Sequence, residues 1–153
     1  MKTQILLTQE GYDTLTLELK QLKEVKRKKA IDRLQKAREM GDLSENSEYV
    51  AAKEELSFIE SRILEIDDKL KKAQVTNHHY NAQKVEIGSR VAITSEGKTE
   101  TYMIVGDLET DIAVGKLAYT SPLGKALIGR KTNEECIVKA PAGLIAYKII
   151  SIH

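Results

Sequence analysis

Two carboxylates, Asp42 and Glu45, are the residues of this chain whose type and spacing could do chemistry. They lie in the segment GDLSENSEY, residues 41–49, and side chains three residues apart converge on one side of a helical turn. Magnesium is usually held by one or two protein carboxylates, with water or phosphate oxygens completing its octahedron. Two carboxylates alone would bind it weakly, so the pair predicts a magnesium site that another macromolecule completes. The D-x-x-E spacing also fits a capping box at the start of a helix, and spacing alone leaves both interpretations open.

A basic stretch precedes these carboxylates. Between Lys20 and Lys29 six basic residues stand against Glu24 alone, whereas residues 42–55 hold five acidic residues against Lys53 alone. The basic stretch could follow a nucleic-acid backbone, but lysine-rich outer faces of coiled coils are common, so the solvated face of a helix is the favoured interpretation. The chain has no Trp, one Phe and six Tyr, so surfaces for base stacking are scarce. This composition argues against an independent RNA-binding module.

The remaining reactive residue types do not assemble into an active site in the sequence. Cys136 is the single cysteine, so neither an intrachain disulfide nor a cysteine-rich zinc site can form, and in an apolar strand it is expected to act as a small hydrophobe. His78 and His79 are adjacent and are interpreted as linker residues. Phosphate-binding glycine motifs are absent. The chain is therefore not expected to be an enzyme by itself.

Length and composition set the scale of the fold. The chain has 153 residues, of which 41% are hydrophobic and 31% charged, with a net charge of +1. These values fit one compact domain or two small ones, and they exclude a disordered tail. No apolar run is long enough for a membrane span, and the first residues lack the pattern of a signal peptide. A cytoplasmic protein without a membrane partner is expected.

The elements that must position the carboxylates are two long helices. Apolar residues recur at alternating steps of three and four from Tyr49 to Ala73, which is the seam of a coiled coil. The preceding segment, residues 8–40, has the same alternation from Tyr12 to Leu22. It then drifts through Val25, Ala30, Leu34 and Ala37, where the four-step intervals indicate a stutter. Thr8 is its expected N-cap. Because the connection around Gly41 is short, the helices must pair antiparallel and place residues 41–48 at the tip of a hairpin.

The second half of the chain follows a different pattern. Short apolar runs bounded by turn residues predict strands, and the segment SPLGKALIGR predicts a short helix with Ser121 as N-cap, Pro122 first and Gly129 as its stop. The predicted strands are Val85–Ile87, Arg90–Thr94, Thr99–Val105, Glu135–Lys139 and Leu144–Ile152. The fold class is therefore α+β, an antiparallel coiled-coil hairpin over residues 1–76 followed by a small antiparallel sheet packed on a short helix over residues 77–153. Because the hairpin covers its own seam, a monomer is expected.

Three ordered segments resemble the bacterial Gre family of transcript cleavage factors. GDLSENSEY with the following AAKEE is similar to one family signature, and SPLGKALIGR followed by VKAPAG is similar to a second. Together with the opening LTQEGYDTL, the resemblance spans almost the whole chain in the right order. It is closer to the GreA branch than to GreB, because the basic run is modest and the net charge nearly neutral.

The resemblance implies a partner and a mechanism. A Gre factor binds bacterial RNA polymerase, inserts its coiled coil through the secondary channel and stimulates the polymerase's own endonucleolytic cleavage of RNA in backtracked, arrested complexes. By the same resemblance Asp42 and Glu45 would help to hold a second Mg²⁺ shared with the polymerase. The C-terminal half would be FKBP-like and would dock on the polymerase.

Further residues take their expected roles from the same resemblance. Asp111, Ser121 and Pro122 lie where the family's docking surface falls, and Arg38 and Lys53 match basic positions near the RNA 3′ end. The chain departs from the family pattern at Ser44, where many relatives carry a basic residue.

Three other functions stay open at this point. A structural relative that enters the channel and inhibits the polymerase would bind without cleavage. A peptidyl-prolyl isomerase would need an aromatic-lined apolar pocket, and residues 77–153 offer only the tyrosines at 80, 102, 119 and 147. A purely structural coiled-coil adaptor would not depend on the tip carboxylates at all.

Overall fold

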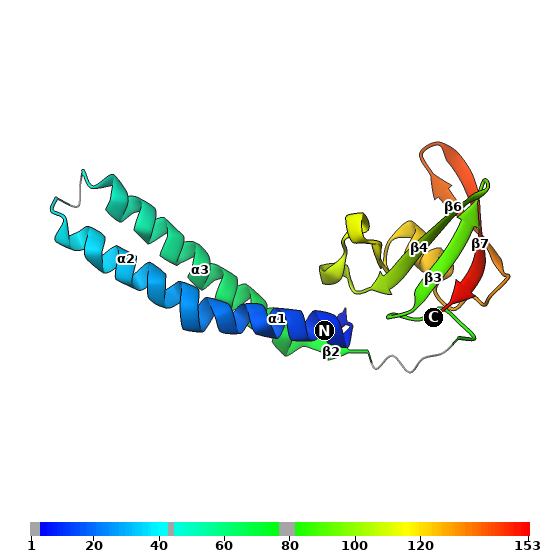
Figure 1. Ribbon diagram of the computed structural model, residues 1–153, viewed down its shortest axis with the longest axis horizontal. Helices are drawn as coiled ribbons and strands as arrows, with labels where there is room; N and C mark the ends of the chain where they lie inside the picture. The colour runs from blue at the N-terminus through cyan, green and yellow to red at the C-terminus, as the bar shows by residue number, and fades with distance from the viewer. Residues whose placement is uncertain (1–3, 43–44, 77–81) are drawn as a thin grey trace. The chain divides into compact units, whose positions relative to one another are not determined.

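The chain forms a helical hairpin and a curled β-sheet (Figure 1). The computed structural model describes residues 4–42, 45–76 and 82–153. These residues divide into two compact units, one built from residues 12–42 and 45–72 and one from residues 4–11 together with 73–76 and 82–153. Within the described ranges, no helix combines the length and apolarity needed to cross a membrane. The predicted linker at residues 77–81 lies outside the described residues.

The first arm of the hairpin is one continuous helical run. It consists of α1 (Gln9–Gln21), a π-helical turn, η1 (Leu22–Lys26), and α2 (Arg27–Glu39). Its seam residues Leu22 and Ala30 are both buried and lie eight positions apart, one more than the seven of a regular heptad, whereas Val25 between them is 46% exposed. A π turn accommodates one additional residue. The predicted stutter therefore takes the form of a π turn, which returns the seam to the interior of the hairpin.

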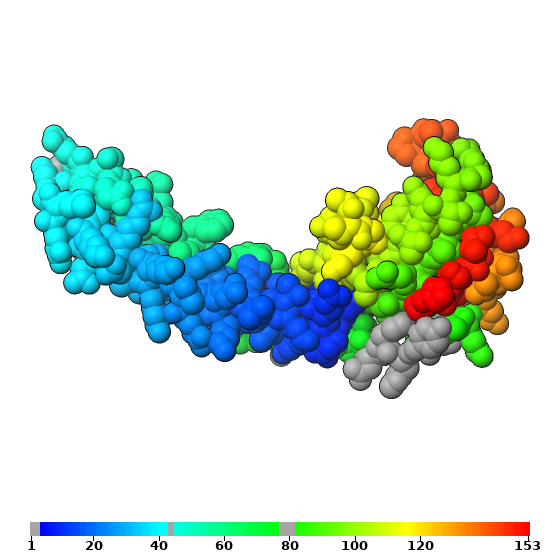
Figure 2. Space-filling model, in the orientation of Figure 1, coloured from blue at the N-terminus to red at the C-terminus, as the bar shows by residue number. Residues whose placement is uncertain are grey.

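The second arm, α3 (Ser47–Lys72), supplies the other half of the seam. The buried core of the hairpin consists of Leu22, Ala30, Ile59, Ile63 and Ile66, and half-buried leucines pack against it from both arms. The predicted period is confirmed, since Ile66 is fully buried whereas Phe58, one position before the seam residue Ile59, is 73% exposed. The space-filling view shows the two arms packed against each other (Figure 2).

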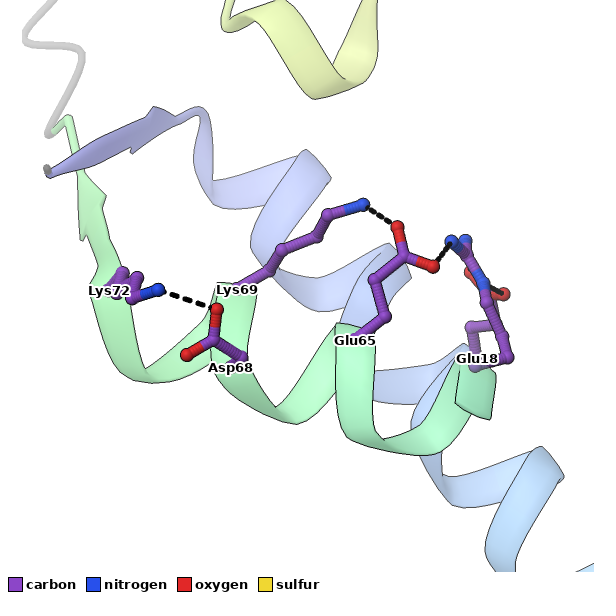
Figure 3. Close-up of polar contacts among 6 residues, drawn as sticks. Glu18, Glu65, Asp68, Lys69 and Lys72 are labelled. Atoms are coloured by element: carbon purple, nitrogen blue, oxygen red, sulfur yellow. Dashed lines mark hydrogen bonds and ion pairs between the residues drawn. The ribbon is translucent and has the colours of Figure 1, made fainter. Parts of the chain in front are cut away.

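Ion pairs cross the hairpin on either side of this seam. The Arg62 guanidinium donates to Glu18 at 2.8 Å, and a nitrogen of Arg27 lies 3.2 Å from a Glu60 oxygen. Other pairs stay within α3, where Lys69 and Lys72 reach back one turn to Glu65 and Asp68 (Figure 3). Exposed pairs each contribute about 0.2–1 kcal/mol, so the main effect of the two cross-arm pairs is to fix the pairing of the arms.

A short two-stranded ribbon lies where the sequence predicted none. β1 (Ile5–Leu7) pairs in parallel with β2 (Ala73–Val75). The predicted seam extends to Ala73, but α3 ends at Lys72 and Ala73 begins a strand. Thr8 follows β1 and caps α1 as predicted, because its hydroxyl accepts a hydrogen bond from the Gly11 N–H at 3.0 Å.

The sheet of the second unit has five strands in the order β5-β4-β3-β7-β6. Its strands are β3 (Arg90–Ser95), β4 (Lys98–Val105), β5 (Lys116–Ala118), β6 (Glu135–Ala140) and β7 (Gly143–Ile152). All neighbours are antiparallel except β4 and β5, which are parallel. Four of the five predicted strands are confirmed, and β5 was not predicted.

The predicted strand Val85–Ile87 is wrong. This segment is irregular, and Val85 instead exchanges two hydrogen bonds of 2.8 Å with the backbone of Gly129 and Arg130. Val85 is fully buried nevertheless. The apolar pattern therefore predicted its burial correctly but not its place outside the sheet.

One face of the sheet is covered by α4 (Pro122–Leu127). Ser121 caps this helix by accepting from the Gly124 N–H at 3.0 Å, Pro122 is its first residue, and Gly129 has φ +78°. The predicted helix start and stop are thus confirmed. The core beneath it contains Leu127 together with Val91, Ile93, Ile104, Cys136 and Ile149. The α+β class with a helical hairpin is confirmed.

Candidate functional site

The tip of the hairpin joins α2 to α3 and carries both candidate carboxylates. α2 ends at Glu39 and α3 begins at Ser47, so Asp42 and Glu45 lie in the connection, and both are exposed. Gly41 has φ +126°, a backbone region that side-chain-bearing residues rarely adopt. Leu43 and Ser44 lie outside the described residues. The tip therefore presents the two carboxylates at the end of a narrow helical rod.

Asn46 closes the tip. Its side-chain oxygen accepts from the Tyr49 N–H at 3.1 Å, which caps α3, and its amide nitrogen donates to the Ala37 carbonyl of α2 at 2.7 Å. One side chain thus caps the second arm and binds the first. The alternative in which Asp42 and Glu45 form the capping box is wrong, because α3 begins after both and Asn46 takes the cap position.

Replacing Asn46 by Ala is expected to loosen the tip. The change removes a helix cap and a bond between the arms, which together cost about 1–3 kcal/mol. Hydrogen exchange at the Tyr49 amide and thermal unfolding measure this loss. Ser47→Ala, at the exposed first residue of α3, is the matched control, and an equal effect of both changes would contradict the assignment of the cap.

Arg33 neutralises part of the acidic stretch. Its Nε donates to Glu48 at 2.7 Å and its Nη2 to the second Glu48 oxygen at 3.1 Å, while Nη1 pairs with Glu55. The hydrogen bond from Arg33 lowers the pKa of Glu48, and its carboxylate partners raise the pKa of Arg33. Glu48 and Glu55 are therefore occupied by a cation of the opposite arm. The other acidic residues of this stretch, Asp42, Glu45 and Glu54, are not among the partners of Arg33.

The Arg33–Glu48 pair predicts a pH dependence of hairpin stability. A carboxyl whose pKa is lowered on folding stabilises the fold above its unfolded value, near 4.5, and this contribution is lost as the pH falls through the lower folded value. We expect Glu48→Gln to lower the melting temperature at pH 7 and to have less effect at pH 3. Thermal unfolding of both chains at the two pH values measures this, and Glu54→Gln controls for loss of one charge on α3. A difference that does not shrink at pH 3 would contradict the prediction.

The two predicted RNA-proximal cations lie on opposite arms. The Arg38 guanidinium lies over the Tyr49 ring, 5.8 Å from its centroid, which is within the range of a cation–π contact. Lys53 is exposed on α3 and has no ion pair among the residues that the structure describes. Tyr49 of the GDLSENSEY segment thus helps to orient Arg38. The role of both cations toward RNA stays a prediction.

The two carboxylates at the tip are suited to a magnesium ion that another molecule also holds. Within the described part of the chain, no group of three or more His, Cys, Asp or Glu residues could hold a metal ion by itself. Two exposed carboxylates are the hard oxygen ligands that Mg²⁺ prefers, but they leave most of its six positions to other groups. The chemistry of Asp42 and Glu45 therefore suits an ion whose remaining ligands come from another molecule.

The candidate docking residues lie on the segment that runs from the end of β4 to the first residue of α4. Asp111 is exposed and its carboxylate accepts from the Ala113 N–H at 3.1 Å, capping the 3-10 helix η3 (Ile112–Val114). The Ser121 hydroxyl donates to the Ala118 carbonyl at 2.7 Å, whereas Pro122 is exposed. Ser121 therefore has a structural role as helix cap, and Asp111 and Pro122 are the more accessible of the three.

Exposed apolar side chains near Asp111 were not predicted as functional. Ile112 and Val114 of η3 are 58% and 67% exposed, and Leu108 of the 3-10 helix η2 (Asp107–Glu109) is 42% exposed. Large apolar residues that stay exposed beside a candidate docking residue are candidate contacts for a partner. A 3-10 helix of three residues has no periodicity from which their exposure could be deduced.

The residues considered for other chemistry are structural where they are described. Cys136 is buried in the sheet core, and burial raises the pKa of its thiol, which keeps it protonated and unreactive. Tyr102, Tyr119 and Tyr147 pack against the same core and are half-buried. His78, His79 and Tyr80 lie outside the described residues. The second unit thus uses its described tyrosines and its cysteine in packing.

Comparison with known proteins gives matches over both halves of the chain. The family described as "Transcription elongation factor, N-terminal" (GreA/GreB) matches residues 5–75, and "Transcription elongation factor, GreA/GreB, C-term" matches residues 80–153. Transcription elongation factor GreA of Pelobacter propionicus is 47% identical, covering 99% of this chain and 98% of its own. GreA of Hyphomonas neptunium is 46% identical, covering 95% of each chain. The solved structure of GreA factor homolog 1 (Gfh1) of Thermus thermophilus is 27% identical, with a TM-score of 0.46, covering 98% of this chain and 99% of that one.

Proposed function

Because the chain belongs to the GreA/GreB family of transcription elongation factors, we propose that it binds bacterial RNA polymerase and stimulates the polymerase's own cleavage of the transcript. The hairpin enters the secondary channel of the polymerase. The RNA is cut endonucleolytically in backtracked, arrested complexes, so that a new 3′ end is available for extension.

The observation that supports this proposal is the charge arrangement at the tip. Glu48 and Glu55 are paired with Arg33 between the two arms, and Asp42 and Glu45 are both exposed in the connection that precedes Ser47. Because both side chains are exposed, a partner can reach two carboxylates at the end of the rod.

The shape of the hairpin supports delivery into a narrow space. α3 has 26 residues, which corresponds to a length of about 39 Å. Two paired helices are only about 20 Å wide. The cross-arm pair of Arg62 with Glu18 and the bond of Asn46 to Ala37 hold the arms together without added bulk at the tip.

Asp42 and Glu45 would hold a Mg²⁺ ion jointly with the polymerase. When bound, this ion supplies charge stabilisation and activates the attacking water, as in two-metal phosphodiester hydrolysis. The two side chains contribute negative charge and oxygen ligands only when the tip is in place. Weak affinity of the isolated tip suits this role, because activity then depends on insertion.

Basic residues near the tip would contact the RNA 3′ end. Lys53 is exposed on α3 and Arg38 is oriented by the Tyr49 ring. Lys and Arg neutralise phosphate charge without reading sequence, which suits a factor that acts on any arrested transcript.

The second unit would dock on the polymerase through Asp111, Ser121 and Pro122. Asp111 and Pro122 are exposed, and Ser121 fixes the start of α4 so that Pro122 is presented at its first turn. The chain acts in this proposal as a cofactor of the polymerase and not as an enzyme, because the hydrolytic centre belongs to the polymerase.

The test uses purified bacterial RNA polymerase stalled in a backtracked register with 5′-labelled RNA. Binding of the intact chain and shortening of the RNA are measured in parallel, against the intrinsic cleavage rate without the chain. We expect both binding and faster shortening. Binding without shortening would make the chain a channel-binding inhibitor, and absence of binding would overturn the assignment of the partner.

A further inference from the structure

The Glu109 carboxylate of η2 binds the first turn of α1. Its Oε2 accepts from the Thr8 N–H at 2.9 Å, and its Oε1 accepts from the Thr8 hydroxyl. The same hydroxyl accepts from the Gly11 N–H at 3.0 Å, and Thr8 is only 6% exposed. The Gly106 N–H also points to Oε2, at 3.4 Å. One carboxylate thus completes the cap of a helix that lies about a hundred residues away in sequence.

The chemistry of a helix N-terminus explains why a carboxylate suits this place. The first N–H groups of a helix have no partner within it, and the helix dipole places positive charge there. A charge-assisted hydrogen bond is about twice as strong as a neutral one. Removing Glu109 would leave the buried Thr8 N–H without the acceptor that now satisfies it.

Two glycines show that the chain is packed around this carboxylate. A methyl group at Gly11 would overlap the Glu109 carboxyl group itself. A methyl group at Gly106 would overlap the Leu6 carbonyl of β1 and lie 3.3 Å from the Glu109 Oε2. Any side chain at either position would displace the carboxylate or the strand, so the contact is a fitted one and not a chance approach of an exposed acid.

The position of Glu109 links two parts of the chain that the proposed function uses. Residues 4–11 belong to the same compact unit as the sheet, and α1 continues beyond Gly11 as the first arm of the hairpin. Glu109 lies two residues before Asp111, on the segment that carries the candidate docking residues. A single side chain therefore connects the start of the hairpin arm to the docking segment.

We propose that Glu109 is a positioning residue for transcript cleavage, which couples the docked sheet unit to the hairpin through Thr8. This inference rests on the proposed function. Docking energy is useful for cleavage only if it also fixes the tip carboxylates, because small misplacement of a catalytic group costs orders of magnitude in rate. Without the Glu109 contact the chain still docks, and the tip is delivered less accurately.

The variants are Glu109→Gln and Glu109→Ala, with Glu135→Gln, at the exposed first residue of β6, as the matched control. Glutamine can turn its oxygen toward the Thr8 and Gly106 N–H groups and its N–H₂ group toward the Thr8 hydroxyl. It loses the negative charge, so an intermediate effect is expected. Because Glu109→Gln is the milder change, its cleavage rate can still be interpreted if Glu109→Ala proves less stable. Circular dichroism confirms that each variant is folded.

Three measurements separate positioning from loss of structure. Hydrogen exchange at the Thr8 and Gly11 amides reports the contact itself, without the polymerase. Polymerase binding gives the half-saturating concentration, and cleavage at saturating factor gives the maximal rate. We expect faster exchange, a half-saturating concentration within about 3-fold of wild type, and a maximal rate reduced about 10-fold or more in Glu109→Ala.

Each contrary outcome overturns a different statement. Unchanged exchange in Glu109→Ala would show that the contact does not hold the helix start. Faster exchange with a wild-type maximal rate would show that the contact has no positioning role, while the proposed function stands. A wild-type chain that neither binds nor stimulates cleavage would overturn the proposed function and, with it, this inference.

Discussion

Asp42→Asn and Glu45→Gln are each expected to reduce stimulated transcript cleavage about 100-fold or more, with polymerase binding within about 2-fold of wild type. Each amide keeps the size of the side chain and removes its charge. A neutral amide is a weaker ligand for Mg²⁺ than a carboxylate. Loss of one carboxylate therefore leaves the shared ion with too few charged ligands from the tip. Because both residues are exposed in the connection before Ser47, neither change should unfold the hairpin.

The magnesium dependence distinguishes a ligand from a residue that merely contacts the partner. If Asp42 and Glu45 bind the ion, raising the Mg²⁺ concentration should partly restore cleavage in either variant. Glu54→Gln removes a comparable exposed charge from α3 and should leave both rate and magnesium dependence unchanged. Undiminished cleavage in both tip variants would instead favour a structural coiled-coil adaptor.

The double variant tests whether the two carboxylates act as one site. Residues that share a ligand are not independent, and the loss of one makes the second less useful. We expect the double variant to be only slightly less active than either single variant. Losses that multiply, for example about 100-fold becoming about 10,000-fold, would indicate two separate functions.

The hairpin could be predicted from the sequence because its signal is local and periodic. Steps of three and four residues decide which side of a helix is buried, and Ile59, Ile63 and Ile66 are buried as expected. The change in apolar spacing that begins at Val25 can be predicted for the same reason. That the drift takes the form of a π turn could not be predicted, because an apolar pattern records the phase of a helix and not its hydrogen bonding.

The strands that were missed depend on distant partners. β1 and β5 have three residues each, and they pair in parallel with segments that short sequence windows do not connect, Ile5 with Ala73 and Lys116 with Met103. Parallel strands require a long connection, so the sequence contains no hairpin turn from which their pairing could be predicted. Val85 shows the opposite error: it is buried but belongs to no strand, and its burial alone made the segment resemble a strand.

The candidate site was predictable in part. The sequence identified Asp42 and Glu45 but left open whether they cap a helix or bind a metal, because both roles use a carboxylate pair at the same spacing. The structure rules out the capping box through Asn46, whose two bonds to Tyr49 and Ala37 require both arms of the hairpin. Metal binding by Asp42 and Glu45 stays a prediction. The contact of Arg33 with Glu48 and Glu55 likewise spans 15 and 22 residues. Such pairs follow from the register of the arms and not from local spacing.

Gly124→Ala is expected to destabilise the sheet unit strongly, although alanine normally stabilises a helix by about 1 kcal/mol relative to glycine. A methyl group at Gly124 would overlap the backbone carbonyl of Ala118, which also accepts from the Ser121 hydroxyl at 2.7 Å. A backbone carbonyl cannot rotate away as a side chain could, so α4 must shift from the core. We expect a loss of about 3 kcal/mol or more in the free energy of unfolding.

Gly97→Ala is the matched control for this effect. Gly97 has φ +78° and open space around its missing side chain, so alanine there meets only backbone strain of about 1–2 kcal/mol. Urea unfolding followed by circular dichroism compares the two variants, and equal losses would show that the close approach to Ala118 is not the cause. Because α4 carries Pro122, we also expect polymerase binding to fail in Gly124→Ala as the sheet unit unfolds, and to persist in Gly97→Ala.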